Sequence, residues 1–169
     1  MKKIFLAAIV LTGAAVNANA QAVATATASA TIVSPISIAK DADMNFGNLS
    51  VSPSAGGTVT MEATAAATRT ASLGGGVSLP ANTGTVSAAQ FTVSGQASFT
   101  YDLVLPTTIT LVNGANAMTV ENFTSSSTGT LDGTGNESFY VGADLIVDAG
   151  QAPGVYTTSS PFFVAVNYN

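Results

Sequence analysis

The sequence predicts an all-β fold, a β-sandwich of about eight to ten short strands. Apolar and polar residues alternate along most of the chain, which is the period of a strand with one buried face. Clusters of Gly, Ser, Asn and Asp separate the alternating runs, as turns do. No stretch combines apolar residues at helical spacing with helix caps, so we expect no helix in the folded domain.

The first twenty residues have the pattern of a signal peptide. The pair Lys2-Lys3 precedes an apolar run over residues 4–16, and the small residues Ala18-Asn19-Ala20 form a cleavage site. The apolar run is shorter than the ~20 residues of a membrane-spanning helix. We therefore expect export through the inner membrane and a mature chain of 169 − 20 = 149 residues. It would cross the periplasm and reach the cell surface or the medium.

Charge excludes several classes of partner. The chain has four basic and nine acidic residues, a net charge of −5. Removal of Lys2 and Lys3 leaves Lys40 and Arg69 against the same nine acids, which gives 2 − 9 = −7. Two isolated cations cannot follow a phosphate backbone. We expect no nucleic-acid binding and no insertion into a membrane.

The chain has neither histidine nor cysteine. Nucleophilic catalysis of the Ser–His or Cys–His type and zinc sites built on imidazole or thiolate are therefore excluded. An exported protein without disulfides must be stabilised by sheet packing.

Two acidic pairs, Asp41/Asp43 and Asp132/Glu137, are the remaining candidates for chemistry, because paired carboxylates can hydrolyse glycosides. Their small and polar neighbours are typical of solvated turns instead. The loop 132–137 is rich in oxygen donors but lacks the ligand spacing of a calcium loop. We assign no catalytic, cofactor-binding or metal-binding residue, and we expect a protein that is not an enzyme and needs no cofactor.

Two long alternating runs predict core strands. Phe99, Tyr101, Leu103 and Leu105 share one face of a strand that ends before Pro106. The second row consists of Phe139, Val141, Ala143, Leu145 and Val147. Shorter strands are expected at 59–63, 89–94, 108–112 and 118–123, and Ser94-Gly95-Gln96 predicts a tight hairpin between two alternating runs.

Both ends of the mature chain are strand-like. Over residues 22–32 every even position is apolar, and most odd positions are Thr or Ser. The even positions are Ala22, Ala24, Ala26, Ala28, Ala30 and Ile32. A second alternating row closes the sequence with Phe162, Val164, Val166 and Tyr168. Such strong alternation predicts sheet elements at both ends rather than frayed tails.

These terminal strands carry a resemblance, together with the segments 31–36, 44–49, 89–95, 139–143 and 154–156. The sequence resembles a fimbrillin-like family of small secreted bacterial proteins of unknown function, and it is similar to the pilin subunits of chaperone–usher fimbriae. The segments span nearly the whole mature chain, although none is a catalytic motif.

The resemblance implies an immunoglobulin-like, pilin-like sandwich that lacks one strand of its own. In such subunits a periplasmic chaperone first fills an open groove, and an outer-membrane usher then assembles the subunits. The N-terminal donor strand of the next subunit finally replaces the chaperone. Carried over here, Phe162, Val164, Val166 and Tyr168 would line the groove and contact the chaperone. Ala22, Ala24, Ala26, Ala28, Ala30 and Ile32 would form the donor strand.

The resulting organisation is a signal peptide over 1–20, an N-terminal extension with the donor strand over 21–34, and a β-sandwich domain over 35–169. The function that it implies is a structural subunit of a surface fibre or coat, whose partners are identical or related subunits. Two alternatives stay open. One is a small eight-stranded outer-membrane β-barrel. The other is a self-contained secreted sandwich that binds carbohydrate or protein.

Overall fold

The structure is a computed structural model that describes residues 21–73 and 75–169. The predicted signal peptide, residues 1–20, lies outside the described residues. Residues 33–169 form one compact unit, and all regular elements described in it are strands. The predicted all-β class is therefore confirmed. Within 21–73 and 75–169, no helix has the length and apolar character needed to cross a membrane.

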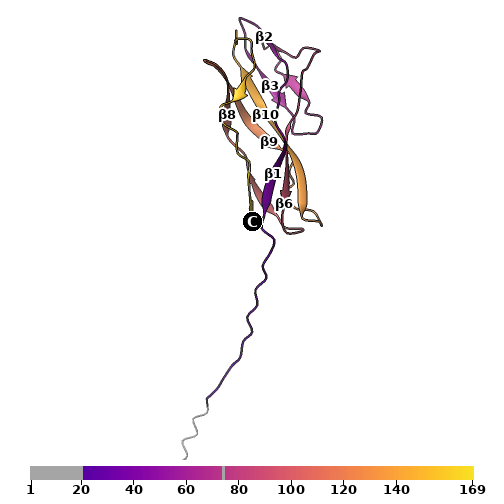
Figure 1. Ribbon diagram of the computed structural model, residues 1–169, viewed down its shortest axis with the longest axis vertical. Coiled ribbons are helices and arrows are strands. Elements are labelled where there is room, and N and C mark those ends of the chain that lie inside the picture. Colours follow the sequence, from indigo (N-terminus) through magenta and orange to yellow (C-terminus); the bar gives the residue numbers. More distant parts are fainter. Residues whose placement is uncertain (1–20, 74) are drawn as a thin grey trace, which may run out of the picture. The chain divides into compact units, whose positions relative to one another are not determined.

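The domain is a sandwich of antiparallel strands, labelled in Figure 1. The strands are β1 (Ser37–Ala42), β2 (Ser50–Val51), β3 (Gly57–Met61), β4 (Arg69–Ala71), β5 (Val77–Ser78), β6 (Ala89–Ser94), β7 (Tyr101–Val104), β8 (Thr108–Asn113), β9 (Asn116–Ser125), β10 (Asn136–Val147), β11 (Thr157–Thr158) and β12 (Ala165–Tyr168). The main sheet has the order β1-β6-β10-β9-β8-β11, with β3 on β10 and β4 on β3. Strand β12 pairs with β7, and β2 pairs with β5, in two further sheets.

Strand β10 is the centre of the main sheet, and it changes partner midway. Its first half pairs with β6 and its second half with β3, whereas β9 lies along its other edge. Gly142 stands at the change of partner, where the ladder to β9 also shifts register. A Cβ at Gly142 would overlap the carbonyl oxygen of Met61. Only glycine allows two strand edges to meet β10 at this point.

The predicted row on β10 is the core of the domain. Phe139, Val141, Ala143, Leu145 and Val147 are all buried, as the alternation predicted. They divide between two clusters. The larger cluster packs Leu145 among residues that include Val59, Met61 and Val120. In the smaller cluster the rings of Phe139 and Phe91 stack with centroids 5.8 Å apart. Burial of each large side chain contributes roughly 1.5–3 kcal/mol.

The predicted hairpin at Ser94-Gly95-Gln96 is wrong. Strand β6 pairs with β1 and β10, and β7 pairs with β12. The connection 95–100 therefore passes from the main sheet to the β12–β7 sheet instead of joining two neighbours. Ser98 adopts a left-handed conformation in this crossing, with φ of 62°. Phe99, predicted to be buried, is 40% exposed because the strand starts only at Tyr101.

Gly142→Ala tests the crowding at β10. We expect the mature chain to lose about 1–3 kcal/mol of unfolding free energy, because strands must shift to admit a methyl group. Urea denaturation measures the change. Gly133→Ala is the matched control, since a Cβ there meets nothing within 4 Å. Equal midpoints for the two variants would contradict the close approach.

Candidate functional site

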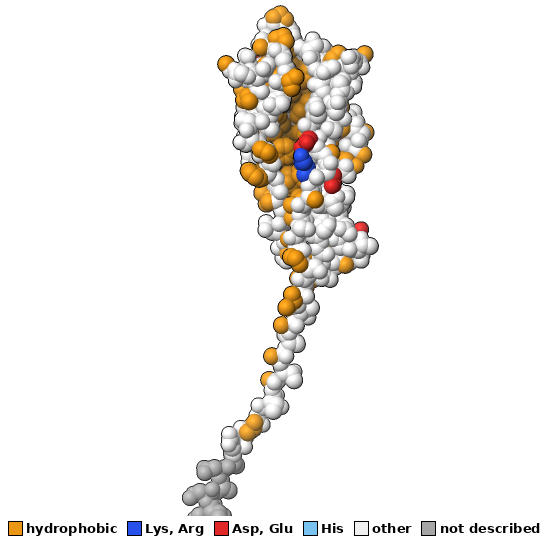
Figure 2. All heavy atoms as spheres, in the orientation of Figure 1, with side chains coloured by type: hydrophobic (Ala, Val, Ile, Leu, Met, Phe, Trp, Pro, Cys, Tyr) orange, Lys and Arg blue, Asp and Glu red, His pale blue; other side chains and the backbone are white. Residues whose placement is uncertain are grey.

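A groove of about 1090 Å³ opens between β1 and the chain that leads into β12. Its floor includes Val120 and Leu145 of the larger core cluster. Ile38 on one wall and Phe162 and Val164 on the other are also apolar. Figure 2 shows hydrophobic side chains gathered in a furrow on this face of the domain. The groove is thus lined by half-buried apolar side chains such as Ile109 and Leu111, which pack against core residues that are themselves buried.

The β1 wall is an open sheet edge. In the order of the main sheet, β1 is the terminal strand. Gly95 donates its N–H to the carbonyl of Gly135, the residue opposite it when the β6–β10 register is continued. Every second residue of β6, counted from Gly95, therefore bonds to β10, and the residues between them, such as Thr92 and Ser94, bond to β1. The register then places Ile38 and Lys40 at non-hydrogen-bonded positions of the β1–β6 ladder. Their main-chain N–H and C=O groups point away from β6, toward the open edge.

Strand β12, which continues the chain of the other wall, has an open edge in the same way. The N–H of Asn169 donates to the carbonyl of Thr100 at 3.4 Å, which fixes the parity of the β12–β7 ladder. Val166 and Tyr168 therefore occupy its non-hydrogen-bonded positions, and their main-chain groups face away from β7. Two strand edges with free hydrogen-bonding capacity thus flank the domain on either side of an apolar floor.

The residues predicted to line the groove divide into two pairs. Phe162 and Val164 line it, and the ring of Phe162 lies 5.6 Å from that of Phe123. Val166 and Tyr168 continue the same half-buried row and pack against the smaller core cluster, but they are outside the groove lining.

The residues predicted as a donor strand belong to no strand in the structure. No strand lies in 21–36, and the side chains over 22–32 are exposed. We call residues 22–32 the leader segment. A strand is defined by the partner to which it bonds, and the part of the chain that the structure describes supplies none for this segment.

Lys40 is a groove residue that sequence reasoning missed. It continues the alternating row of Ile36, which precedes β1, and Ile38 on β1, and it lines the groove together with Asp43. Its Nζ lies 2.6 Å from Oδ1 of Asp43, and both side chains are mostly exposed. Such a pair stabilises the fold little. An inward-pointing charge on an edge strand does, however, disfavour indiscriminate strand pairing. The alternation Ile36, Ile38, Lys40 in the sequence was the available signal.

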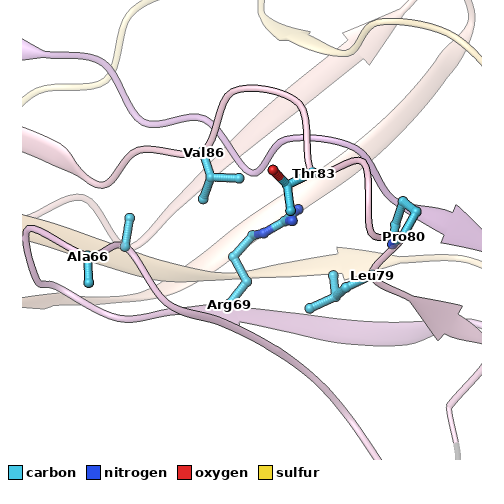
Figure 3. Close-up of a pocket in the computed structure, with 7 residues that line it drawn as sticks. Ala66, Arg69, Leu79, Pro80, Thr83 and Val86 are labelled. Carbon is cyan, nitrogen blue, oxygen red and sulfur yellow. The ribbon is translucent and has the colours of Figure 1, made fainter.

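Arg69 supports the rim of the groove. It lines a small separate hollow of about 350 Å³, where Figure 3 shows it among Leu79, Pro80 and Thr83. Its guanidinium donates to the carbonyl oxygens of Phe46 and Asn48. Both of those residues line the groove. Arg69 therefore holds the loop at 46–48 in place, and part of its hydrogen-bonding capacity is used by main-chain carbonyls.

Of the acidic pair 132/137, Glu137 is the half-buried member. Its carboxylate accepts hydrogen bonds from the Tyr101 hydroxyl, from Ser127 and from both the N–H and hydroxyl of Thr128. Burial raises the pKa of Glu137, but these hydrogen bonds outweigh it and leave the pKa below its usual value. Burial, and next the bond to Glu137, raise the pKa of Tyr101 to about 12. The cluster ties β10 to β7, the strand that carries β12.

Asp132 closes the neighbouring turn. Its Oδ1 accepts from the N–H groups of Thr134 and Asn136 and from the Thr134 hydroxyl. These bonds, that of Asn136 first, lower the pKa of its carboxyl. The two carboxylates of the pair thus serve two different loops, which is the arrangement expected of turn residues.

Glu137→Gln should destabilise the mature chain by about 1–2 kcal/mol at pH 7, since an amide nitrogen cannot accept the bonds made to one carboxylate oxygen. A carboxylate whose pKa is lowered in the folded state stabilises the fold at pH values above its unfolded-state pKa of 4.5. This stabilisation is lost as the pH falls through the folded-state pKa. The variant should therefore show a flatter loss of stability below pH 4.5 in urea titrations.

Glu62→Gln is the control for this prediction, because the exposed Glu62 carboxylate accepts no hydrogen bond from the described residues. Acid profiles of the wild type and Glu137→Gln that run parallel would show that the Glu137 cluster does not stabilise the fold.

A family model for a domain of unknown function, DUF4402, matches residues 36–168. The match begins just before β1 and includes β12, so it covers both walls of the groove. No curated protein and no solved structure matches the chain. Because the match spans most of its length, the chain belongs to the DUF4402 family.

Proposed function

We propose that the protein is a structural subunit of a bacterial surface fibre or coat, and that it assembles by donor-strand exchange. The observation that supports this most is the groove, an apolar floor between the open edge of β1 and residues 161–164, which lead into the second open edge at β12. Open edges beside an apolar groove are a template for one more strand. A sandwich with such a groove supports the incomplete, immunoglobulin-like domain that the sequence resemblance implies.

The occupant in this proposal is the leader segment of a second copy. Its eleven positions, 22–32, span roughly 36 Å when extended at about 3.3 Å per residue. The apolar face is narrow, with alanine at every even position except Ile32. Small side chains suit a groove whose floor is already built from full-sized residues such as Val120 and Leu145. The Thr and Ser residues of the opposite face would remain in water.

Main-chain pairing would supply most of the binding energy. Each hydrogen bond contributes a net ~0.5–1.5 kcal/mol, and both walls offer them. Burial of one alanine methyl contributes at most roughly 0.8 kcal/mol. The leader segment is exposed and pairs with none of the residues that the structure describes. Summed along the strand, these terms support a long-lived joint without large apolar anchors.

The proposal extends to the route of export. The signal peptide over 1–20 would deliver the chain to the periplasm. There the apolar groove and its open strand edge would need a temporary cover, the role that the resemblance gives to a periplasmic chaperone. An outer-membrane usher would then exchange the chaperone for the leader segment of the next subunit at the cell surface.

A mixing experiment tests the joint. One variant lacks residues 22–32 and keeps its groove. The other keeps its leader segment but carries Val164→Arg, which places an unpaired charge in the groove wall. We expect each variant alone to be monomeric by size-exclusion chromatography with light scattering, and an equimolar mixture to form one-to-one dimers. The wild type should form ladders on gels run without boiling.

Val104→Arg is the matched control for the blocked groove, because Val104 is an exposed residue of β7 outside the groove lining. It should leave assembly unchanged. If the mixture stays monomeric although both variants are folded, strand donation is wrong, and a self-contained sandwich becomes the better description.

A further inference from the structure

Ser34, the residue that ends the predicted extension, is held at both of its main-chain groups. Its N–H donates to Oε1 of Gln96 at 3.3 Å. Its carbonyl accepts from the Tyr168 hydroxyl at 2.9 Å. That hydroxyl in turn accepts the N–H of Gln96 at 2.6 Å. We call these three residues the Ser34 clamp, which fastens the start of the domain to the end of β12 and to the connection after β6.

The neighbours of the clamp are shaped to receive the Tyr168 hydroxyl. A Cβ at Gly95 would overlap that oxygen, so a larger residue at this position would displace the Tyr168 hydroxyl. The Tyr168 ring meets the ring of Phe99 edge-on, with centroids 5.6 Å apart. The glycine, the ring contact and the three hydrogen bonds all fix one position for Tyr168. Tyr168, which the sequence predicted to line the groove, therefore lies at the base of the N-terminal extension instead.

Pro35 limits the chain at the same point. A proline ring fixes φ near −65° and restricts the preceding residue to extended conformations. Ser34 is not among the residues with positive φ. Two-residue hairpin turns of types I′ and II′ need positive φ at their first central residue. Ser34-Pro35 is therefore unable to form the tight turn that would fold the leader segment back along the open edge of β1.

Fold-back is the reaction with which assembly must compete. A strand joined to its own groove by a short linker has an effective concentration in the millimolar range. Self-filling would therefore exceed pairing between copies at ordinary subunit concentrations, unless the intervening turn is costly. The free main-chain groups of Ile38 and Lys40 are the ones such a hairpin would use.

We infer that the Ser34 clamp and Pro35 keep the leader segment out of its own groove and so direct it to the groove of another copy. This inference rests on the proposed function and adds to it the device that selects assembly over self-completion. The clamp acts on the turn and not on the groove, so it can be removed while donor and acceptor stay intact.

Two variants each remove one half of the device, and the triple variant that combines them removes both. Tyr168→Phe deletes the hydroxyl and keeps the ring. The double change Ser34→Asn and Pro35→Gly installs the pair that most favours a tight hairpin. Tyr140→Phe is the control, since the Tyr140 hydroxyl bonds to none of the described residues. Assembly is followed by light scattering, and hydrogen exchange measures amide protection over residues 22–32.

We expect the wild type and Tyr140→Phe to form oligomers. The triple variant should shift toward monomers, with amide protection in the leader segment of these monomers raised about tenfold or more over that of an exposed segment. Adding Val164→Arg, which blocks the groove, should abolish that protection. A triple variant that assembles like the wild type would overturn the inference and leave the proposed function standing. A monomeric wild type would overturn both if its leader is unprotected. If its leader is protected, the clamp does not prevent fold-back.

Discussion

Main-chain hydrogen bonding at two strand edges is the constraint on which the rest of the structure depends. Ile38 on β1 and Val166 on β12 direct peptide groups away from their only sheet partners. Between these edges lies an apolar floor that belongs to the core. A strand added there would satisfy both requirements at once, because it brings peptide groups to the edges and side chains to the floor. Burial alone or hydrogen bonding alone would not select an extended strand as the segment that fits the groove.

The features around the groove hold its walls without closing it. Arg69 holds the loop at 46–48 through main-chain carbonyls. Glu137 joins β10 to β7 and thereby positions the sheet that contains β12. Lys40 and Asp43 place a charged pair in the groove lining, next to the apolar Ile38 of β1. The chain has no disulfides, so these polar contacts hold the loops and strand ends in place. The two core clusters supply the bulk of the stability.

Local alternation predicted the strands well but not their partners. The row from Phe139 to Val147 was found because the period of two is a property of one strand and its buried face. The error at Ser94-Gly95-Gln96 arose because a glycine turn looks the same whether it joins neighbouring strands or passes between sheets. The groove was half predicted for the same reason. Phe162 and Val164 follow from parity in the C-terminal strand, whereas the β1 wall depends on pairing between residues far apart in the sequence.

The alanine face of the leader segment has a mechanical consequence. Because side chains repeat every two residues along a strand, displacing this segment by two positions puts alanine where alanine was, from Ala22 to Ala30. A joint made through residues 22–30 would have several bound positions of nearly equal energy, spaced roughly 7 Å apart, and Ile32 alone among the even positions would distinguish them. Under tension such a joint would yield by short sliding steps before it separates, and relaxation would let it return. A segment with large residues at every inward position would instead hold firmly and then fail in a single event.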